Sequence, residues 1–112
     1  MTDLSFEKLV NLSSIQKEFN EYQSTYFPKR SSRFFALELC GEAGELANLE
    51  KKDWRRDDNP EAPKMLEEDY AKEASDVFIA LMNYCNEKEI DLADAVKEKL
   101  KIIEQRRIER KI

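Results

Sequence analysis

Histidine is absent from this chain of 112 residues, and its absence excludes several kinds of chemistry. Without an imidazole, the protein has no histidine base and no histidine-activated nucleophile, and it lacks the usual ligand sets for zinc or di-iron. Any catalysis must therefore depend on carboxylates, lysine, tyrosine, cysteine or a hard metal ion.

The chain has only two glycines and three prolines, so few of its residues favour turns. Glutamate, lysine, leucine and alanine dominate, and there is no sustained alternation of β-branched residues. This composition favours an all-α fold. The length fits a single domain, residues 1–112, with one modest core.

Cysteine pairs and long apolar runs are lacking too. Cys40 and Cys85 are far apart, with no CxxC motif, and each has an apolar helical context, so we expect two buried, reduced thiols rather than a disulfide. The longest apolar run, 77–82, is too short to cross a membrane, and no signal peptide is recognised. The expectation is a cytoplasmic protein with no membrane partner.

The net charge of −5 argues against a nucleic-acid partner. An acidic chain repels nucleic acid and free nucleotides unless cations gather at one site. Charged residues make up 38% of the chain, so carboxylates at helical spacing also occur by accident. Each acidic motif has to be judged against that background.

Four helical segments are predicted. Ser13 and Ser14 could break the first, Pro28 ends it, and a loop at 57–63 separates the second from the third. Asp91 caps the last segment, which has basic residues in its final turn. The predicted helices cover about 6–26, 33–56 (after Ser31-Ser32), 64–89 and 92 onward.

Two of these segments carry a carboxylate on an otherwise apolar face. Glu42 interrupts the stripe formed by Phe35, Leu39, Leu46 and Leu49. Glu73 interrupts the stripe formed by Leu66, Tyr70, Val77, Leu81 and Tyr84. Glu45 follows Glu42 by three residues and Asp76 follows Glu73 by three, so each pair projects from one side of its helix.

The spacing of the two pairs predicts that they face each other. With Pro60 as the turn, Glu45 lies 15 residues before it and Glu73 lies 13 after it. At about 1.5 Å of rise per residue, their heights on antiparallel helices agree within about 3 Å. The same count for Glu42 and Asp76 gives 18 and 16 residues.

Four facing carboxylates would repel one another unless a cation compensates them. Oxygen donors without histidine or cysteine favour Mg²⁺, or Mn²⁺, over zinc. Such a cluster attracts a polyphosphate and activates water for attack on phosphorus. The alternative is that these are ordinary solvated glutamates, as single E-x-x-E pairs in acidic chains usually are.

Both glycines, Gly41 and Gly44, flank Glu42 inside a predicted helix. A helical glycine costs roughly 1 kcal/mol relative to alanine, so their presence needs a reason. Close approach of either a ligand or a neighbouring helix would supply one.

The two acidic motifs resemble the signature of the all-α nucleoside triphosphate pyrophosphohydrolases, the MazG-like superfamily. The stretch 37–47, LELCGEAGELA, is similar to the first family motif, and 73–81, EASDVFIAL, is similar to the second. Segments 90–92 and 96–100 resemble the entry to the last family helix. The resemblance covers about 15–107 and is closest to short dCTP pyrophosphatase-like members.

That resemblance implies a four-helix-bundle-like fold that assembles into a homodimer or a dimer of dimers. It also implies Mg²⁺ bound by Glu42, Glu45, Glu73 and Asp76. The implied reaction is hydrolysis of a (deoxy)nucleoside triphosphate to a monophosphate and pyrophosphate, as house-cleaning of the nucleotide pool.

One departure from the family concerns phosphate contacts. Many members carry Lys-x-x-x-Asn in the last helix; Lys99 matches the lysine, but Ile103 stands in the place of the asparagine. Arg106 or Arg107 would then be the alternative source of phosphate contacts.

Further candidates lie around the carboxylates. Glu38, one turn before Glu42, is either a catalytic carboxylate that orients water, together with Glu45, or a plain surface residue. Predicted substrate contacts, each with a structural alternative in the core or on the surface, are Phe35, Lys52, Trp54, Asn83 and Lys99.

Two other functions remain open from the sequence. A phosphoribosyl-ATP pyrophosphohydrolase would share the superfamily motifs and act on a bulkier substrate. A non-catalytic helical oligomerisation module would carry the same carboxylates as surface residues.

Overall fold

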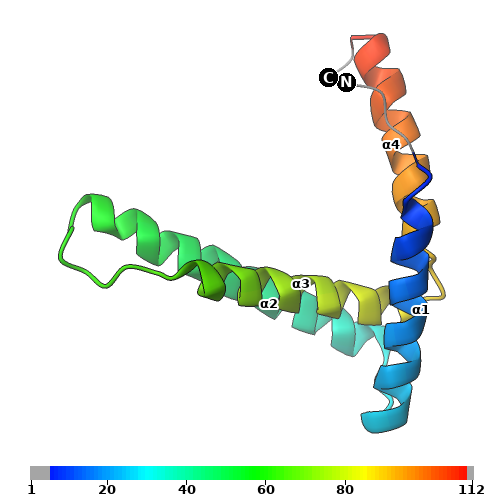
Figure 1. Cartoon of the computed structure of the whole chain (residues 1–112), viewed down its shortest axis with the longest axis horizontal. Coiled ribbons are helices and arrows are strands. Elements are labelled where there is room, and N and C mark those ends of the chain that lie inside the picture. Colours follow the sequence, from blue (N-terminus) through cyan, green and yellow to red (C-terminus); the bar gives the residue numbers. More distant parts are fainter. Residues whose placement is uncertain (1–5, 111–112) are drawn as a thin grey trace. The chain divides into compact units, whose positions relative to one another are not determined.

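The computed structural model describes residues 6–110, and every regular element within them is helical. Four α-helices follow in order, with a short 3₁₀ helix, η1, after the second (Figure 1). This confirms the all-α prediction. The elements are α1 (Leu9–Tyr26), α2 (Ser32–Trp54), η1 (Arg55–Asp57), α3 (Glu67–Glu87) and α4 (Leu92–Ile108).

The chain divides into two compact units. One comprises Met1–Lys29 and Cys85–Ile112 and contains α1 and α4, and the other, Arg30–Tyr84, contains α2 and most of α3. None of the helices in the described part of the chain is long and apolar enough to cross a membrane.

A buried amide holds the first unit together. The Gln16 side chain on α1 donates hydrogen bonds to Asn86 Oδ1 (3.0 Å) and the Ile90 carbonyl (2.7 Å). Its Oε1 accepts the Leu92 N–H at 2.9 Å. This one side chain therefore ties α1 to the end of α3 and to the start of α4.

The predicted break at Ser13 and Ser14 is wrong, because α1 continues through both residues. The Ser14 hydroxyl donates to the Val10 carbonyl one turn earlier (3.2 Å), and the Ser13 hydroxyl donates to the Asp91 carboxylate (2.9 Å). Since both hydroxyls have partners within a continuous helix, neither is needed as a cap.

Asp91 caps α4 as predicted, because its carboxylate accepts the Asp94 N–H at 3.2 Å. The preceding turn contains Glu89 with φ of 58°, a left-handed conformation that glycine usually occupies. The Ile90 N–H returns to the Cys85 carbonyl at 2.8 Å, which is the Schellman pattern of a helix end.

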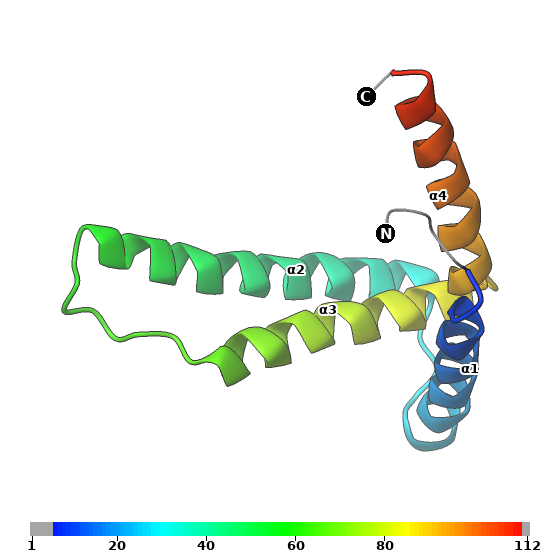
Figure 2. The ribbon, with the colours of Figure 1, turned by 45° about the horizontal axis from the view of Figure 1, so that its top comes forward.

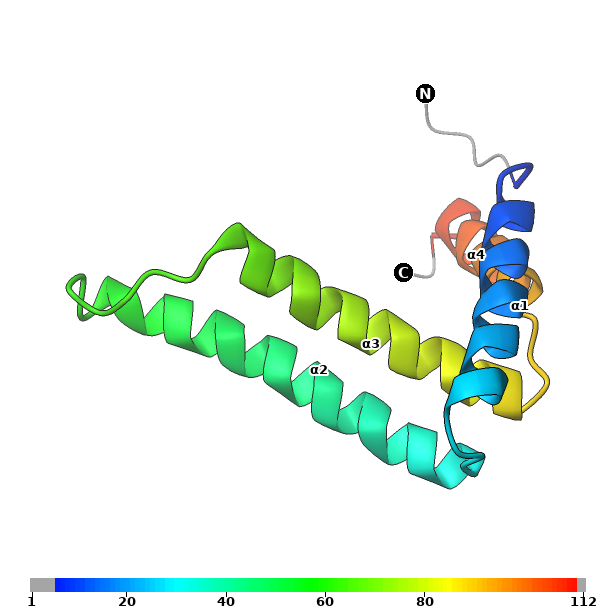
Figure 3. The same cartoon turned by 60° about the horizontal axis from the view of Figure 1, so that its bottom comes forward.

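In the second unit, α2 and α3 run antiparallel and side by side, as Figures 2 and 3 show from two directions. Ser31 caps α2 by accepting the Phe34 N–H at 3.3 Å. Toward the other end of α2, burial and the negative charges of Asp53 and Glu50 raise the pKa of Tyr70 on α3. The Tyr70 hydroxyl therefore lies near acidic residues of α2, close to the connecting loop.

The third helix begins at Glu67, not near residue 64. Arg56 Nε donates to the Ala62 carbonyl at 3.1 Å, which holds the loop in a non-helical path. The Leu66 N–H then donates to the Asp69 carboxylate at 3.1 Å, and this satisfies a backbone donor at the helix start.

The cysteine prediction is half right. Both thiols are free, but only Cys85 is buried and Cys40 is exposed. Cys40 precedes Glu42 by two residues, so at 100° per residue it lies on the other side of α2. The face of α2 that carries Glu42 is the half-buried one.

Candidate metal centre

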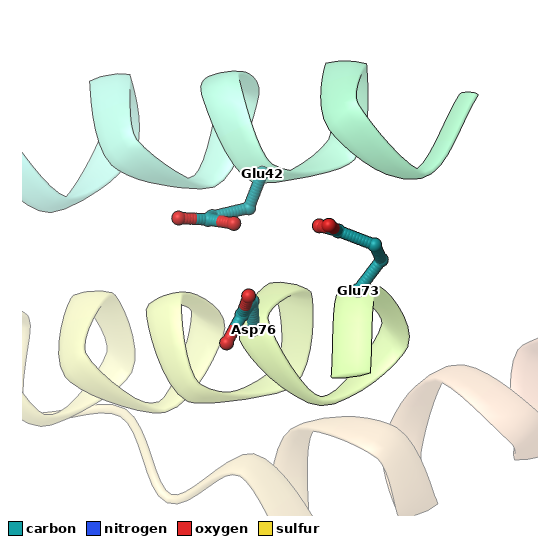
Figure 4. A group of neighbouring side chains, drawn as sticks. All are labelled: Glu42, Glu73 and Asp76. Atoms are coloured by element: carbon teal, nitrogen blue, oxygen red, sulfur yellow. The ribbon is translucent and has the colours of Figure 1, made fainter. Parts of the chain in front are cut away.

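Three of the four predicted carboxylates converge between α2 and α3. Figure 4 shows Glu42 reaching from α2 toward Glu73 and Asp76 on α3. One carboxylate oxygen from each of the three lies within 4.8 Å of the others. Oxygens at this separation can share one cation.

The local sequence explains this convergence. Glu42 occupies the half-buried stripe of α2 between Leu39 and Leu46, and Glu73 occupies the half-buried stripe of α3 four residues before Val77. Because the helices are antiparallel and joined by one loop, their apolar stripes face each other and bring these carboxylates into the same gap.

Two of these oxygens lack a partner. Glu42 Oε2 and Glu73 Oε2 are both buried, and neither accepts a hydrogen bond from the described residues. Burying a carboxylate oxygen without a donor is unfavourable, and a cation bound between the two would offset that cost. The donor set and the unpartnered oxygens thus fit a hard metal ion.

The electrostatics agree with this geometry. Burial raises the pKa of Glu42 above the ordinary glutamate value, and the negative charges of Glu45, Asp76, Glu73 and Glu38 raise it further. Burial also raises the pKa of Glu73, with further contributions from neighbouring carboxylates and from a hydrogen bond to Glu45. In the absence of a cation, protons are the available compensation for this negative charge.

The predicted catalytic carboxylates stand at the edge of this cluster. Glu45 is exposed, and its negative charge contributes to the raised pKa of Glu73. Glu38 is exposed and acts on Glu42 through its charge. Both are therefore beside the triad formed by Glu42, Glu73 and Asp76.

The sequence reading overlooked Asp69. It lies one turn before Glu73 on α3, and its charge contributes to the raised pKa of Glu73. The i, i+4 spacing of the two residues was the available signal. Asp69 also accepts the Leu66 N–H, so it combines a structural contact with a charge near the site.

Gly41 and Gly44 face open space within the described part of the chain. A Cβ added at either position meets no atom within 4 Å. Packing by another helix of the same chain is thus not the reason for these glycines. Gly44 follows Glu42 by two residues, so, like Cys40, it lies on the other side of α2 from Glu42.

The predicted substrate contacts fall in different places. Phe35 and Asn83 are buried in the unit that holds the carboxylates. Lys52 and Trp54 are exposed on α2, ten and twelve residues beyond Glu42, or about 15 and 18 Å along the helix. Lys99 is an exposed residue of α4, in the other unit.

No protein-family model, curated protein or solved structure matches this chain. The assignment of a function therefore rests on the site and on the motif residues that form it.

Proposed function

We propose that this protein is an Mg²⁺-dependent nucleoside triphosphate pyrophosphohydrolase of the MazG-like kind. Its substrate would be a deoxynucleoside triphosphate, dCTP-like or non-canonical, and its products a monophosphate and pyrophosphate. One observation carries the proposal: Glu42, Glu73 and Asp76 bring oxygens within 4.8 Å of one another, and two buried oxygens there have no donor among the described residues.

The donors favour a hard cation. All three are carboxylates, with no nitrogen or sulfur ligand among them, and this set suits Mg²⁺ or Mn²⁺ rather than zinc. Glu45, whose charge acts on Glu73, would supply a fourth carboxylate at the edge of the triad. Bound Mg²⁺ would neutralise phosphate charge and lower the pKa of water.

Residues of the chain would bind the cation and accept the proton from water. Glu42, Glu73 and Asp76 hold the cation and thereby attract a triphosphate to an otherwise repulsive acidic groove. Glu38 and Glu45 are exposed beside them, where either carboxylate can accept the proton of an attacking water.

Self-association is part of the proposal. Leu37 and Trp54 on α2 are each 75% exposed, although both are large apolar side chains. They lie 17 residues apart, about 25 Å along α2, and do not form one patch. The proposal of a homodimer or a dimer of dimers with a four-helix-bundle-like arrangement therefore rests on the resemblance of the motifs.

A product analysis tests the activity. The full-length protein is incubated with Mg²⁺ and each canonical or modified triphosphate, and with phosphoribosyl-ATP, and the products are resolved. We expect pyrophosphate and a nucleoside monophosphate from at least one deoxynucleoside triphosphate. Release of orthophosphate, or no turnover of any substrate, would contradict the proposal; turnover of phosphoribosyl-ATP alone would favour the alternative enzyme.

Matched variants locate the site. Glu42→Gln, Glu73→Gln and Asp76→Asn should each lower kcat/KM by at least about 100-fold, a loss typical for groups that stabilise charge in the transition state. Glu18→Gln, an exposed glutamate of α1, removes the same charge away from the cluster and should leave activity unchanged. Full activity in the triad variants would refute the site.

A further inference from the structure

Asp76 is the exposed member of the metal triad, whereas Glu42 and Glu73 are half-buried between α2 and α3. A cation bound by these three carboxylates is therefore reached from solvent on the side of Asp76. A molecule that approaches the cation first meets the residues of α3 that share this side.

Lys72 lies on that side of α3. It precedes Asp76 by four residues, which places the two residues one helical turn apart, about 6 Å along the helix and on the same face. Lys72 is exposed, and it is the only basic residue among the 21 residues of α3. It is therefore the one positive charge that α3 itself brings next to the triad.

Lys72 has no anionic partner within residues 6–110. A lysine at this position could pair with Glu68, one turn earlier, or with Asp76, one turn later. The ion pairs of the described chain involve other cations, namely Arg56, Lys101 and Arg107. The ammonium group of Lys72 is thus available to a bound anion.

The groove around the triad carries an excess of negative charge. Besides Glu42 and Glu73 themselves, four carboxylates act on this pair through their charges: Glu38, Glu45, Asp69 and Asp76. One Mg²⁺ offsets two of these six charges, so a polyphosphate still meets a repulsive field unless a further cation takes part. A basic side chain next to the triad supplies that positive charge.

The basic residues of α2 are more distant from the triad. Arg33 precedes Glu42 by nine residues and Lys51 follows it by nine, so each lies about 14 Å away along the helix. Lys52 lies one residue further, and Lys99 belongs to the other unit. Among the basic residues of α2 and α3, Lys72 is therefore the nearest to the carboxylates along the helices.

We propose that Lys72 binds a phosphate group of the substrate on the Asp76 side of the metal triad. This rests on the proposed function, since the anion is the triphosphate that the cation attracts. Hydrogen bonds from an ammonium group to phosphate oxygens are charge-assisted and are stronger than neutral ones. Lys72 thereby takes the role for which the sequence suggested Lys52 and Lys99.

The charge of Lys72 acts on Mg²⁺ and on phosphate in opposite directions, because it repels a cation at the triad and attracts an anion held there. Lys72→Met removes the charge and keeps an unbranched side chain of good helix propensity. It should leave the affinity for Mg²⁺ alone unchanged or raise it, and lower the affinity for inorganic pyrophosphate in saturating Mg²⁺. If Lys72 only supported the fold, both affinities would fall together.

The experiment compares the full-length wild type with Lys72→Met, Lys72→Arg and the control Lys51→Met, at an exposed lysine of α2. Calorimetry measures binding of Mg²⁺ alone and of inorganic pyrophosphate with Mg²⁺, which requires no hydrolysis, and kcat/KM is measured for the deoxynucleoside triphosphates. We expect Lys72→Met to lower pyrophosphate affinity and kcat/KM at least about tenfold, as for the loss of one hydrogen bond between charged groups. Lys72→Arg should retain most of both, and Lys51→Met should change neither.

The outcomes for phosphate binding by Lys72 and for hydrolysis are distinct. If Lys72→Met keeps its pyrophosphate affinity and kcat/KM, or loses Mg²⁺ affinity to the same extent, the role of Lys72 is overturned, while hydrolysis by the wild type still supports the proposed function. Pyrophosphate binding that depends on Mg²⁺ and on Lys72, without hydrolysis of any triphosphate, supports phosphate binding and overturns the proposed activity. Absence of both hydrolysis and pyrophosphate binding in the wild type overturns both.

Discussion

Glu42 on α2 and Glu73 on α3 each bury one carboxylate oxygen, Oε2, that accepts no hydrogen bond from the described residues. The two side chains point toward each other and toward Asp76 across the gap between the helices (Figure 4). A buried carboxylate oxygen without a hydrogen-bond donor lowers the stability of the folded state. A cation bound between the two side chains would offset that loss. The first three predictions below follow from that relationship.

Neutralising one carboxylate of the pair should stabilise the metal-free protein. In chelator-treated samples at neutral pH, we expect Glu42→Gln and Glu73→Gln to raise the melting temperature, because each removes a charge that its neighbours repel. The exposed control Glu18→Gln should show no comparable change. A lower melting temperature in both triad variants would mean that the charges support the fold.

Magnesium should stabilise the wild type and not these variants. A ligand that binds only the native state at 100 times its dissociation constant adds about 2.7 kcal/mol to the free energy of unfolding. Thermal denaturation with and without saturating Mg²⁺, followed by chelation, measures the effect. A non-catalytic oligomerisation module would show no Mg²⁺-dependent shift in the wild type.

The stability of the metal-free protein should fall as pH rises above the ordinary glutamate pKa. The pKa values of Glu42 and Glu73 are raised in the folded state by burial and by neighbouring carboxylates, so the folded state binds protons more tightly than the unfolded state. The favourable contribution is present below the unfolded pKa and is lost as pH rises through the raised values.

Thermal denaturation across pH, in a chelator, measures this dependence. The double variant Glu42→Gln/Glu73→Gln is the matched comparison and should lose most of the slope in that window. Because Mg²⁺ competes with the same protons, its affinity for the wild type should increase over the same pH range. Equal slopes in the wild type and the double variant would rule out these two groups as the cause.

Replacing Gln16 should destabilise the unit formed by α1 and α4. In Gln16→Leu the Leu92 N–H and the Ile90 carbonyl lose a buried partner, which costs about 1–3 kcal/mol of unfolding free energy. Urea denaturation measures the loss, and Glu18→Gln, an exposed change on the same helix, is the control. Similar effects of the two changes would contradict a structural role for the Gln16 side chain.

Replacing the two glycines by alanine should affect activity and stability differently. An added Cβ meets no atom of the described chain at Gly41 or Gly44, so Gly41→Ala and Gly44→Ala should each gain roughly 0.5–1 kcal/mol in helix stability. If the free space admits substrate, at least one of them should lose activity. A parallel loss of stability and activity in both variants would instead indicate packing against a second molecule.

Helix type and most helix ends follow from short-range rules. Ser31 and Asp91 accept the N–H of the residue three positions later, a contact that involves only neighbours in the chain and is therefore predictable from sequence. The start of α3 is less predictable, because it depends on the Arg56 contact with the Ala62 carbonyl. The hydrogen bond from Ser13 to Asp91, a residue distant in the sequence, was likewise not predictable from short-range rules.

The facing of Glu42 with Glu73 and Asp76 was predictable from the chain alone. Helical rise, the 3.6-residue period and one connecting loop determine which residues of an antiparallel pair lie at equal height. The open space beside Gly41 and Gly44 and the exposure of Cys40 could not be obtained in this way. Both depend on which faces of α2 receive a neighbour.

Asn83 shows this division most clearly. Its place on the face of Asp76 is determined by the sequence, since helical periodicity relates residues seven positions apart. Its burial, at 7% exposure, was decided only by tertiary structure. Burial and pairing depend on atoms that other segments of the chain bring near a side chain, and local sequence does not specify those atoms.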